Sequence, residues 1–185
     1  MSTQKDAVAE VVKAARAANA LIVADIGSQS GWLKAVEDDD RHLYLSGPMG
    51  LASSVALGVA MARPERAVIA ICGDGALAMN LSSLVTIAHA KAKNLTVVVI
   101  DNAVYDYTKQ VETPSVSISW PDVGAGCFGR DNVCDVSELA SRGISATGGP
   151  LFVVAKVEAT GDMPPPLGLA PDQIARRFAA TAQTG

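Results

Sequence analysis

An aspartate between two glycines, and an asparagine further along the chain, carry the clearest chemical signal in this sequence. Gly73-Asp74-Gly75 and Asp101-Asn102 each follow a strongly apolar segment, residues 67–72 and 95–100. Because neighbouring parallel strands end at the same edge of a sheet, we expect Asp74 and Asn102 to lie close together. Carboxylate and amide oxygens suit a hard divalent cation, and glycines let a phosphate approach the backbone. The sequence therefore predicts a site for a metal ion and a diphosphate.

The composition favours one folded domain over residues 1–185. Of the 185 residues 49% are hydrophobic but only 4% are aromatic, so the core must consist mainly of Ala, Val, Leu and Ile. A net charge of −4 without a basic cluster argues against nucleic acid or an anionic membrane surface as a partner. We expect no membrane span and no secretory signal, because no apolar run has the required length or place. Three cysteines without CxxC spacing argue against zinc and favour the reducing cytoplasm.

Apolar strand-like segments alternate with helix-forming segments along most of the chain. This alternation is typical of a parallel sheet covered on both faces, so we predict a three-layer α/β fold. The expected strands are 21–24, 42–45, 67–72, 95–100 and 151–157. The expected helices are 6–19, 32–36, 51–61, 76–88, one opening near 135 and one after 171; residues 25–31 should form a turn and 103–130 mostly loop. Ligands of such sheets bind beyond the carboxyl ends of the strands.

A second glycine pattern, Gly124–Gly129, matches the G-x-G-x-x-G of dinucleotide-binding proteins. We predict no such site, because no convincing strand precedes it, Pro121 interrupts it, and no acidic residue follows about twenty residues later. His42 and His89 stand alone, and we expect them to be surface or packing residues.

Two segments resemble those of a known enzyme family. Gly73-Asp74-Gly75 through Asn102 resembles the thiamine diphosphate-binding motif. The stretch Ser46–Ser54, Ser-Gly-Pro-Met-Gly-Leu-Ala-Ser-Ser, is similar to a stretch of sulfopyruvate and phosphonopyruvate decarboxylases. The resemblance runs from Leu21 to Phe178 and implies the diphosphate-binding (PP) domain of thiamine diphosphate-dependent 2-oxo acid decarboxylases.

The resemblance implies a role for each residue of the expected site. A Mg²⁺ ion would be bound by Asp74, the Asn102 side chain and the backbone carbonyl of Val104. Met49 would hold the cofactor in its bent shape, and the carbonyl of Gly47 would accept a hydrogen bond from the 4′-amino group of the pyrimidine; these two are the expected catalytic positions. The residues expected around the diphosphate are Ser28, Gln29, Gly73, Gly75 and Ala76.

The chain departs from the family just after Asn102. The relatives usually carry a Tyr-Gly-x-Thr-Gly run there, whereas this chain has Tyr105-Asp106-Tyr107-Thr108, with aspartate replacing glycine. Because this loop usually faces the substrate, the departure bears on the identity of the substrate. Tyr105, Tyr107 or Lys109 could contact the substrate or could be solvated loop residues.

The resemblance also implies a partner. The family activates its cofactor with a glutamate on a pyrimidine-binding (PYR) domain, and the length of this chain is taken up by the diphosphate half. We therefore expect a PYR-domain α subunit, with this chain as the β subunit of a decarboxylase acting on a small anionic 2-oxo acid such as sulfopyruvate. Two alternatives stay open: a carboligase subunit like that of acetolactate-forming enzymes, and a non-catalytic cofactor-binding regulatory subunit.

Overall fold

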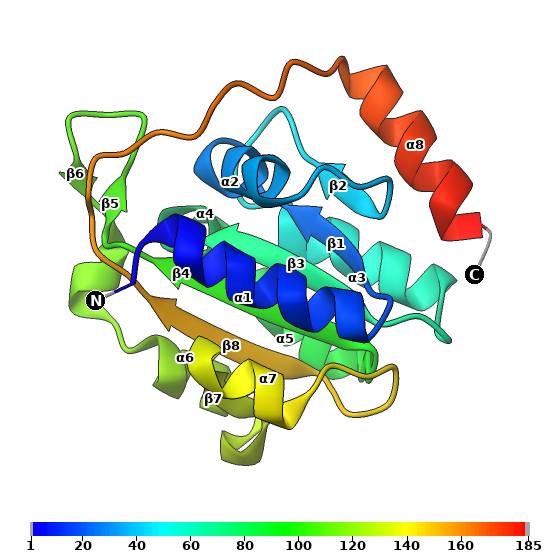
Figure 1. The fold of residues 1–185 in the computed structure, drawn as a ribbon. Helices are drawn as coiled ribbons and strands as arrows, with labels where there is room; N and C mark the ends of the chain where they lie inside the picture. Colours follow the sequence, from blue (N-terminus) through cyan, green and yellow to red (C-terminus); the bar gives the residue numbers. More distant parts are fainter. Residues whose placement is uncertain (1, 184–185) are drawn as a thin grey trace.

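A computed structural model describes residues 2–183 as a twisted parallel sheet between two layers of helices (Figure 1). The six strands lie in the order β2-β1-β3-β4-β8-β7, and every neighbouring pair is parallel. Their bounds are β1 Leu21–Ala24, β2 His42–Tyr44, β3 Val68–Gly73, β4 Leu95–Asp101, β7 Val133–Asp135 and β8 Leu151–Lys156. The predicted three-layer α/β fold is confirmed.

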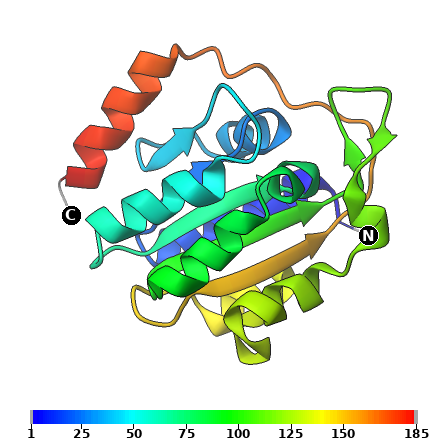
Figure 2. The same cartoon turned by 180° about the vertical axis from the view of Figure 1, so that it is seen from behind.

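The central strands β3 and β4 are buried along their whole length, as expected for a sheet covered on both faces. Alternate residues of β3 enter different cores: Ile69 and Ile71 pack on one face, Val68 and Ala70 on the other. The helices are α1 Gln4–Ala17, α2 Ser28–Val36, α3 Ala52–Ala62, α4 Asp74–Met79, α5 Ser82–Ala90, α6 Trp120–Phe128, α7 Leu139–Arg142 and α8 Pro171–Gln183. α1 and α7 cover one face, whereas α3, α5 and α6 cover the other (Figures 1 and 2).

The segment 103–130, expected to be mostly loop, contains regular structure. It forms a small hairpin, β5 Val104–Tyr105 with β6 Val111–Glu112, then a 3-10 turn at Pro114–Ser117, then α6. Pro121 lies in the first turn of α6, where its missing N–H costs nothing. Gly124 lies against the ring of Phe152, and a side chain there would collide with it. Of the glycines that suggested a loop, Gly124 is required by close packing and Gly129 caps the helix with a positive φ. The rejected G-x-G-x-x-G pattern therefore lies in this helix and its C-terminal cap.

The helix expected over residues 76–88 is interrupted. α4 ends at Met79 and α5 begins at Ser82, because Asn80 leaves the helical conformation. The Asn80 amide donates to the Gly50 carbonyl at 2.8 Å and to Ser54 Oγ at 3.1 Å. The break thus ties α4 to the turn that precedes α3. The helix α2 is longer than expected. Residues Ser28–Gly31, predicted to belong to the preceding loop turn, form the first turn of this helix.

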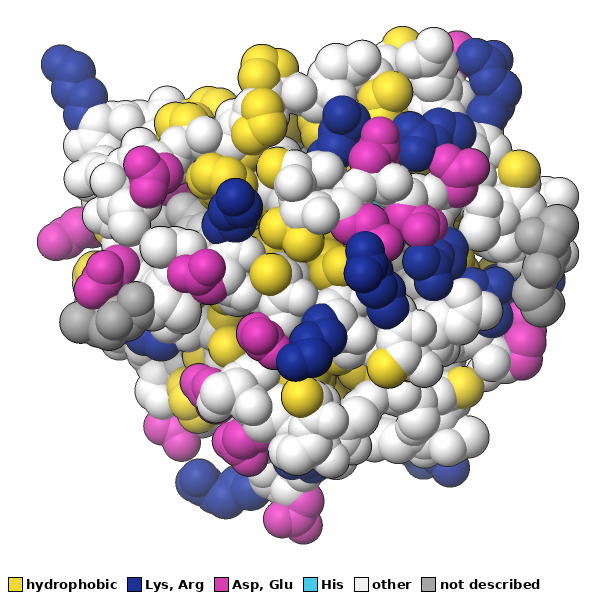
Figure 3. All heavy atoms as spheres, in the orientation of Figure 1, with side chains coloured by type: hydrophobic (Ala, Val, Ile, Leu, Met, Phe, Trp, Pro, Cys, Tyr) yellow, Lys and Arg dark blue, Asp and Glu magenta, His cyan; other side chains and the backbone are white. Residues whose placement is uncertain are grey.

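The C-terminal segment returns over the carboxyl-end edge of the sheet. After β8 it runs past α2 to α8, which lies beside β2 (Figure 1). Pro164 packs against Gly31 so closely that a side chain on Gly31 would collide with it. Arg177 binds Asp38 at 2.9 Å and Asp40 at 2.5 Å, and basic and acidic side chains lie next to each other on this face (Figure 3).

Two histidines, one helix start and the lengths of the helices bear on smaller expectations. His42 is buried and His89 exposed, in agreement with packing and surface roles. The helix expected to open near residue 135 begins with a 3-10 turn, Val136–Glu138, which the Asp135 side chain caps and which leads into α7. Within residues 2–183 no helix has the length and apolar character needed to cross a membrane.

Candidate functional site

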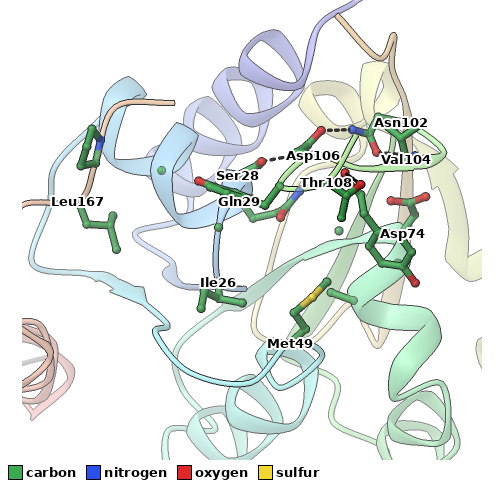
Figure 4. Close-up of a pocket in the computed structure, with 18 of the residues that line it drawn as sticks. Ile26, Ser28, Gln29, Met49, Asp74, Asn102, Val104, Asp106, Thr108 and Leu167 are labelled. Carbon is green, nitrogen blue, oxygen red and sulfur yellow. Dashed lines mark hydrogen bonds between the residues drawn. The ribbon is translucent and has the colours of Figure 1, made fainter. Parts of the chain in front are cut away.

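A cavity of about 480 Å³ lies beyond the carboxyl ends of β1, β3 and β4 (Figure 4). It brings together every predicted site residue except Gly47. Its walls come from the turns after these strands, from Met49, from the β5–β6 hairpin and from the C-terminal segment. The lining residues are Ile26, Gly27, Ser28, Gln29, Gly31, Met49, Gly73, Asp74, Gly75, Ala76, Asn102, Val104, Tyr105, Asp106, Tyr107, Thr108, Pro165, Pro166 and Leu167.

Asp74 is the first residue of α4 and is almost completely buried. The hydroxyl of Thr113 donates a hydrogen bond to its carboxylate. Burial raises the pKa of Asp74 to about 6, an effect increased by the charge of Asp101 and opposed by hydrogen bonds from Thr113 and the Gly75 N–H. The carboxylate is therefore mostly ionised at neutral pH, at a site where its charge is poorly solvated and where a cation would be favoured.

Asn102 directly follows β4 and is also buried. Its Oδ1 accepts a hydrogen bond from the Val104 N–H at 3.3 Å, and its Nδ2 donates to Asp106 at 2.7 Å. Ala103, in between, has a left-handed φ of 62°, so the chain turns sharply at this point. The turn keeps Val104 on the cavity wall beside Asn102, as the predicted metal site requires.

The glycines of the Gly-Asp-Gly turn leave room for close neighbours. A Cβ on Gly73 would lie 3.1 Å from the amide of Gln29, and one on Gly75 would collide with Tyr105. The oxygen set of Asp74, Asn102 and Val104, beside a backbone without side chains, fits a hard cation carrying an anionic group. In the described part of the chain no three His, Cys, Asp or Glu side chains form a metal-binding group, and the predicted set needs only one carboxylate.

Met49 stands on the other wall of the cavity, with its side chain directed inward (Figure 4). Gly47 does not line the cavity; it is exposed, with a φ of 134°. Its predicted carbonyl contact stays a prediction. Tyr105 and Tyr107 line the cavity, whereas Lys109 is exposed and lies outside it, so a substrate contact by Lys109 gains no support.

Asp25 is a site residue that our reading of the sequence missed. It follows β1 directly, has no exposed surface, and accepts a hydrogen bond from the Gly50 N–H at 3.1 Å. The Ile26 N–H also donates to it, at 3.2 Å. Burial raises the pKa of Asp25, and the nearby backbone N–H groups oppose this effect only in part. Asp25 therefore fixes the turn that carries Met49. The signal was available, because Asp25 follows a strand just as Asp74 does.

We expect Asp25→Asn to lower the free energy of unfolding by about 1–3 kcal/mol, because the new amide group would face backbone N–H donors. Urea unfolding measures this change. The control Asp162→Asn, in the exposed C-terminal segment, should stay within about 0.5 kcal/mol of the unchanged protein. Equal stability of Asp25→Asn and the control would contradict the role given to Asp25.

The buried Asp74 makes the stability of the metal-free protein depend on pH. Its pKa of about 6 exceeds the value of roughly 3.9 in an unfolded chain. This raised pKa stabilises the fold fully below about pH 4, and the contribution is lost as the pH rises through about 6. With a chelator present, Asp74→Asn should therefore be more stable than the unchanged protein by about 1–3 kcal/mol at neutral pH. Unfolding curves at several pH values test this, and a difference that persists at pH 4 would refute it.

Comparison with known proteins agrees with this geometry. Residues 25–140 match the family model described as thiamine pyrophosphate enzyme, C-terminal TPP binding domain. The chain belongs to this family. As a thiamine pyrophosphate-binding domain, it carries Gly73-Asp74-Gly75 and Asn102 inside the matched region, and the predicted resemblance is confirmed.

Two kinds of relative stand out. The chain is 32% identical to the sulfopyruvate decarboxylase subunit beta of Methanococcus maripaludis over 85% of this chain and 86% of that subunit. It is 33% identical to the phosphonopyruvate decarboxylase of Streptomyces viridochromogenes over 90% of this chain but only 43% of that enzyme. It thus spans less than half of the phosphonopyruvate decarboxylase.

A solved structure supports the fold. The chain superposes with a TM-score of 0.61 and 21% identity on a chain described as a thiamin diphosphate-dependent enzyme from Mycobacterium smegmatis, covering 84% of this chain and 31% of that one. At this identity the likeness concerns the three-layer fold alone.

Proposed function

We propose that this chain is the β subunit of a thiamine diphosphate- and Mg²⁺-dependent decarboxylase of a small anionic 2-oxo acid. With sulfopyruvate the products would be sulfoacetaldehyde and CO₂. One observation carries the proposal: Asp74, Asn102 and Val104 share a single cavity with Met49. The similarity to sulfopyruvate decarboxylase β subunits over most of their length points to the substrate class.

Each wall of the cavity has a distinct task in this proposal. Asp74, Asn102 Oδ1 and the Val104 carbonyl would hold Mg²⁺, which neutralises the diphosphate. Met49 would support the bent cofactor from the opposite wall, with the Gly47 carbonyl at the pyrimidine. The residues that would surround the diphosphate are Ser28, Gln29, Gly73, Gly75 and Ala76. When bound, thiamine diphosphate supplies the electron sink that decarboxylation of a 2-oxo acid needs.

A partner would have to complete the site. The residues that line the cavity include no glutamate, so the acid that activates the pyrimidine would come from a PYR-domain α subunit. A suitable contact surface begins at Leu51, two residues after Met49, and continues over exposed residues of α3, α4 and α5. These helices lie on one side of the sheet (Figure 2). The "apolar face" there consists of exposed side chains: Leu51 39%, Met61 67%, Met79 60%, Leu81 39% and Val85 64%.

The packing of α3 and α5 supports the use of this face. The two helices touch through a 2.8 Å hydrogen bond between the hydroxyls of Ser53 and Ser83. Asn80 joins the Met49 turn to the same helices. Exposed apolar side chains gathered on neighbouring elements mark interaction surfaces. A subunit seated here would therefore lie close to Met49, which lines the cavity. The free cysteines Cys72, Cys127 and Cys134 fit a complex in the reducing cytoplasm.

The substrate class is tested by assaying CO₂ release by the chain together with its PYR-domain partner. We expect sulfopyruvate or phosphonopyruvate to be decarboxylated with a higher kcat/KM than pyruvate, with a free aldehyde as the product. A product with a new carbon–carbon bond, formed in preference to the aldehyde, would favour the carboligase alternative. Equal kcat/KM values for pyruvate and the two anionic substrates would contradict the proposed substrate class.

A further inference from the structure

The β5–β6 hairpin covers the groups that the proposed function assigns to the cofactor. We propose that the carboxylate of Asp106, in the turn of this hairpin, competes with the cofactor's diphosphate for the same hydrogen-bond donors. The segment 103–113, here named the Asp106 loop, would then have to move away before the diphosphate can bind. This inference rests on the proposed function, because it presumes that the diphosphate binds in this cavity.

Asp106 receives hydrogen bonds from three separate parts of the chain. Ser28 Oγ donates to it at 2.5 Å and Asn102 Nδ2 at 2.7 Å (Figure 4). Gln4 Nε2 donates to both carboxylate oxygens, at 3.0 and 3.1 Å. All three donors are buried, with exposed fractions of 3%, 7% and 8%. Buried donors placed around one carboxylate form a ready-made anion site. Ser28 and Asn102 are also members of the predicted cofactor site.

Two tyrosines of the same loop cover the glycines of the site. Tyr105 lies against Gly75, and Tyr107 lies against Gly27, where an added Cβ would come within 2.9 Å of its ring. Thr113, at the end of the loop, donates to the Asp74 carboxylate. One segment thus contacts the turns after β1, β3 and β4 at once. A diphosphate that approaches these turns would meet the loop at each of them.

The short strands and strained turns of the Asp106 loop are typical of a segment that can move. Its two strands pair over only two residues each, Val104 with Glu112 and Tyr105 with Val111. Ala103 and Gln110 both adopt positive φ, at 62° and 53°, which is strained for residues other than glycine. A short hairpin with strained turns has little stability of its own and is held by its contacts with the site. Because Asp106 makes most of the hydrogen bonds between the Asp106 loop and the site, its carboxylate determines how strongly the loop is held over the cavity.

Binding of thiamine diphosphate and, separately, of pyrophosphate can be measured by titration calorimetry with Mg²⁺ on the chain in complex with its partner. In Asp106→Ala we expect both ligands to bind about tenfold more tightly, because the closed loop no longer reduces the fraction of binding-competent molecules. Asp106→Asn, which keeps the shape of the side chain but removes its charge, should also bind both ligands more tightly. Asp131→Asn, which neutralises an exposed aspartate outside the site, is the matched control and should leave both affinities unchanged.

Ser28→Ala provides a second test. In the unchanged protein this substitution removes a donor from both Asp106 and the ligand, so the affinity should change little. In the Asp106→Ala background it removes a donor from the ligand alone, so the affinity should fall about tenfold. Unchanged or weaker binding by Asp106→Ala and Asp106→Asn, with normal binding by the unchanged protein, would overturn the inference. Binding by none of these proteins would overturn the proposed function, and this inference with it.

Discussion

Replacing Asp74 by alanine should abolish turnover and weaken binding of thiamine diphosphate with Mg²⁺ by at least about 100-fold. Asp74 is the one carboxylate in the predicted metal set, and its burial leaves no water to replace its charge. Without it the metal would keep only the neutral oxygens of Asn102 and Val104, and the diphosphate would lose its neutralising ion. Calorimetry with cofactor and Mg²⁺, followed by steady-state assays of the complex, measures both effects.

Two further variants make this result specific. Asp122→Ala removes an exposed carboxylate of α6 and should leave affinity and turnover unchanged. Asp106→Ala removes another carboxylate of the same cavity, yet it should tighten binding. Opposite effects at positions 74 and 106 would separate a metal ligand from a competing anion. If Asp74→Ala kept full turnover at saturating cofactor and metal, the motif would have no catalytic role, and the regulatory-subunit alternative would be favoured.

The chain alone should decarboxylate its substrate about 10²–10⁴-fold more slowly than the chain with its PYR-domain partner, since a positioned acid–base group usually contributes this factor. The expectation follows from a cavity that offers oxygen ligands and donors but no glutamate. Mixing the two purified subunits at increasing ratios and measuring CO₂ release tests it. Full activity of the isolated chain would contradict the divided active site.

The apolar face gives this experiment a structural control. Val85 is 64% exposed on α5, and Val85→Lys would place a charge where the partner is expected to pack. We expect this variant to lose association with the partner and to lose activity, while its thermal unfolding stays unchanged. Glu10→Lys, on the exposed side of α1 across the sheet, changes the charge by more than Val85→Lys does. This control should keep both its association with the partner and its activity. A Val85→Lys complex that assembles normally would show that the partner docks elsewhere.

The predicted parts of the fold depended on local patterns. The strands around Ile69 and Val98 consist almost wholly of apolar residues, since both faces of a parallel sheet are covered. Such runs can be recognised in the sequence without knowledge of the neighbouring strands. The helix α6 could not be recognised in this way. Pro121 and Gly124 have low helix propensity, and only the position of Phe152, almost thirty residues later, shows that glycine is needed there.

The sequence by itself determined the motif residues, because Asp74 and Asn102 each follow a strand end and parallel strands end at one edge. Only the tertiary structure showed that Asp25 supports the Met49 turn and that Asp106 takes up the donors of the site. Asp106 meets Gln4 across 102 positions of the chain, and such contacts leave no periodic pattern in the sequence. They arise when the sheet brings separate turns together. The sequence thus identified the residues at the strand ends that suit a metal ion and a diphosphate. The packing of distant loops over these residues determines whether a ligand can reach them.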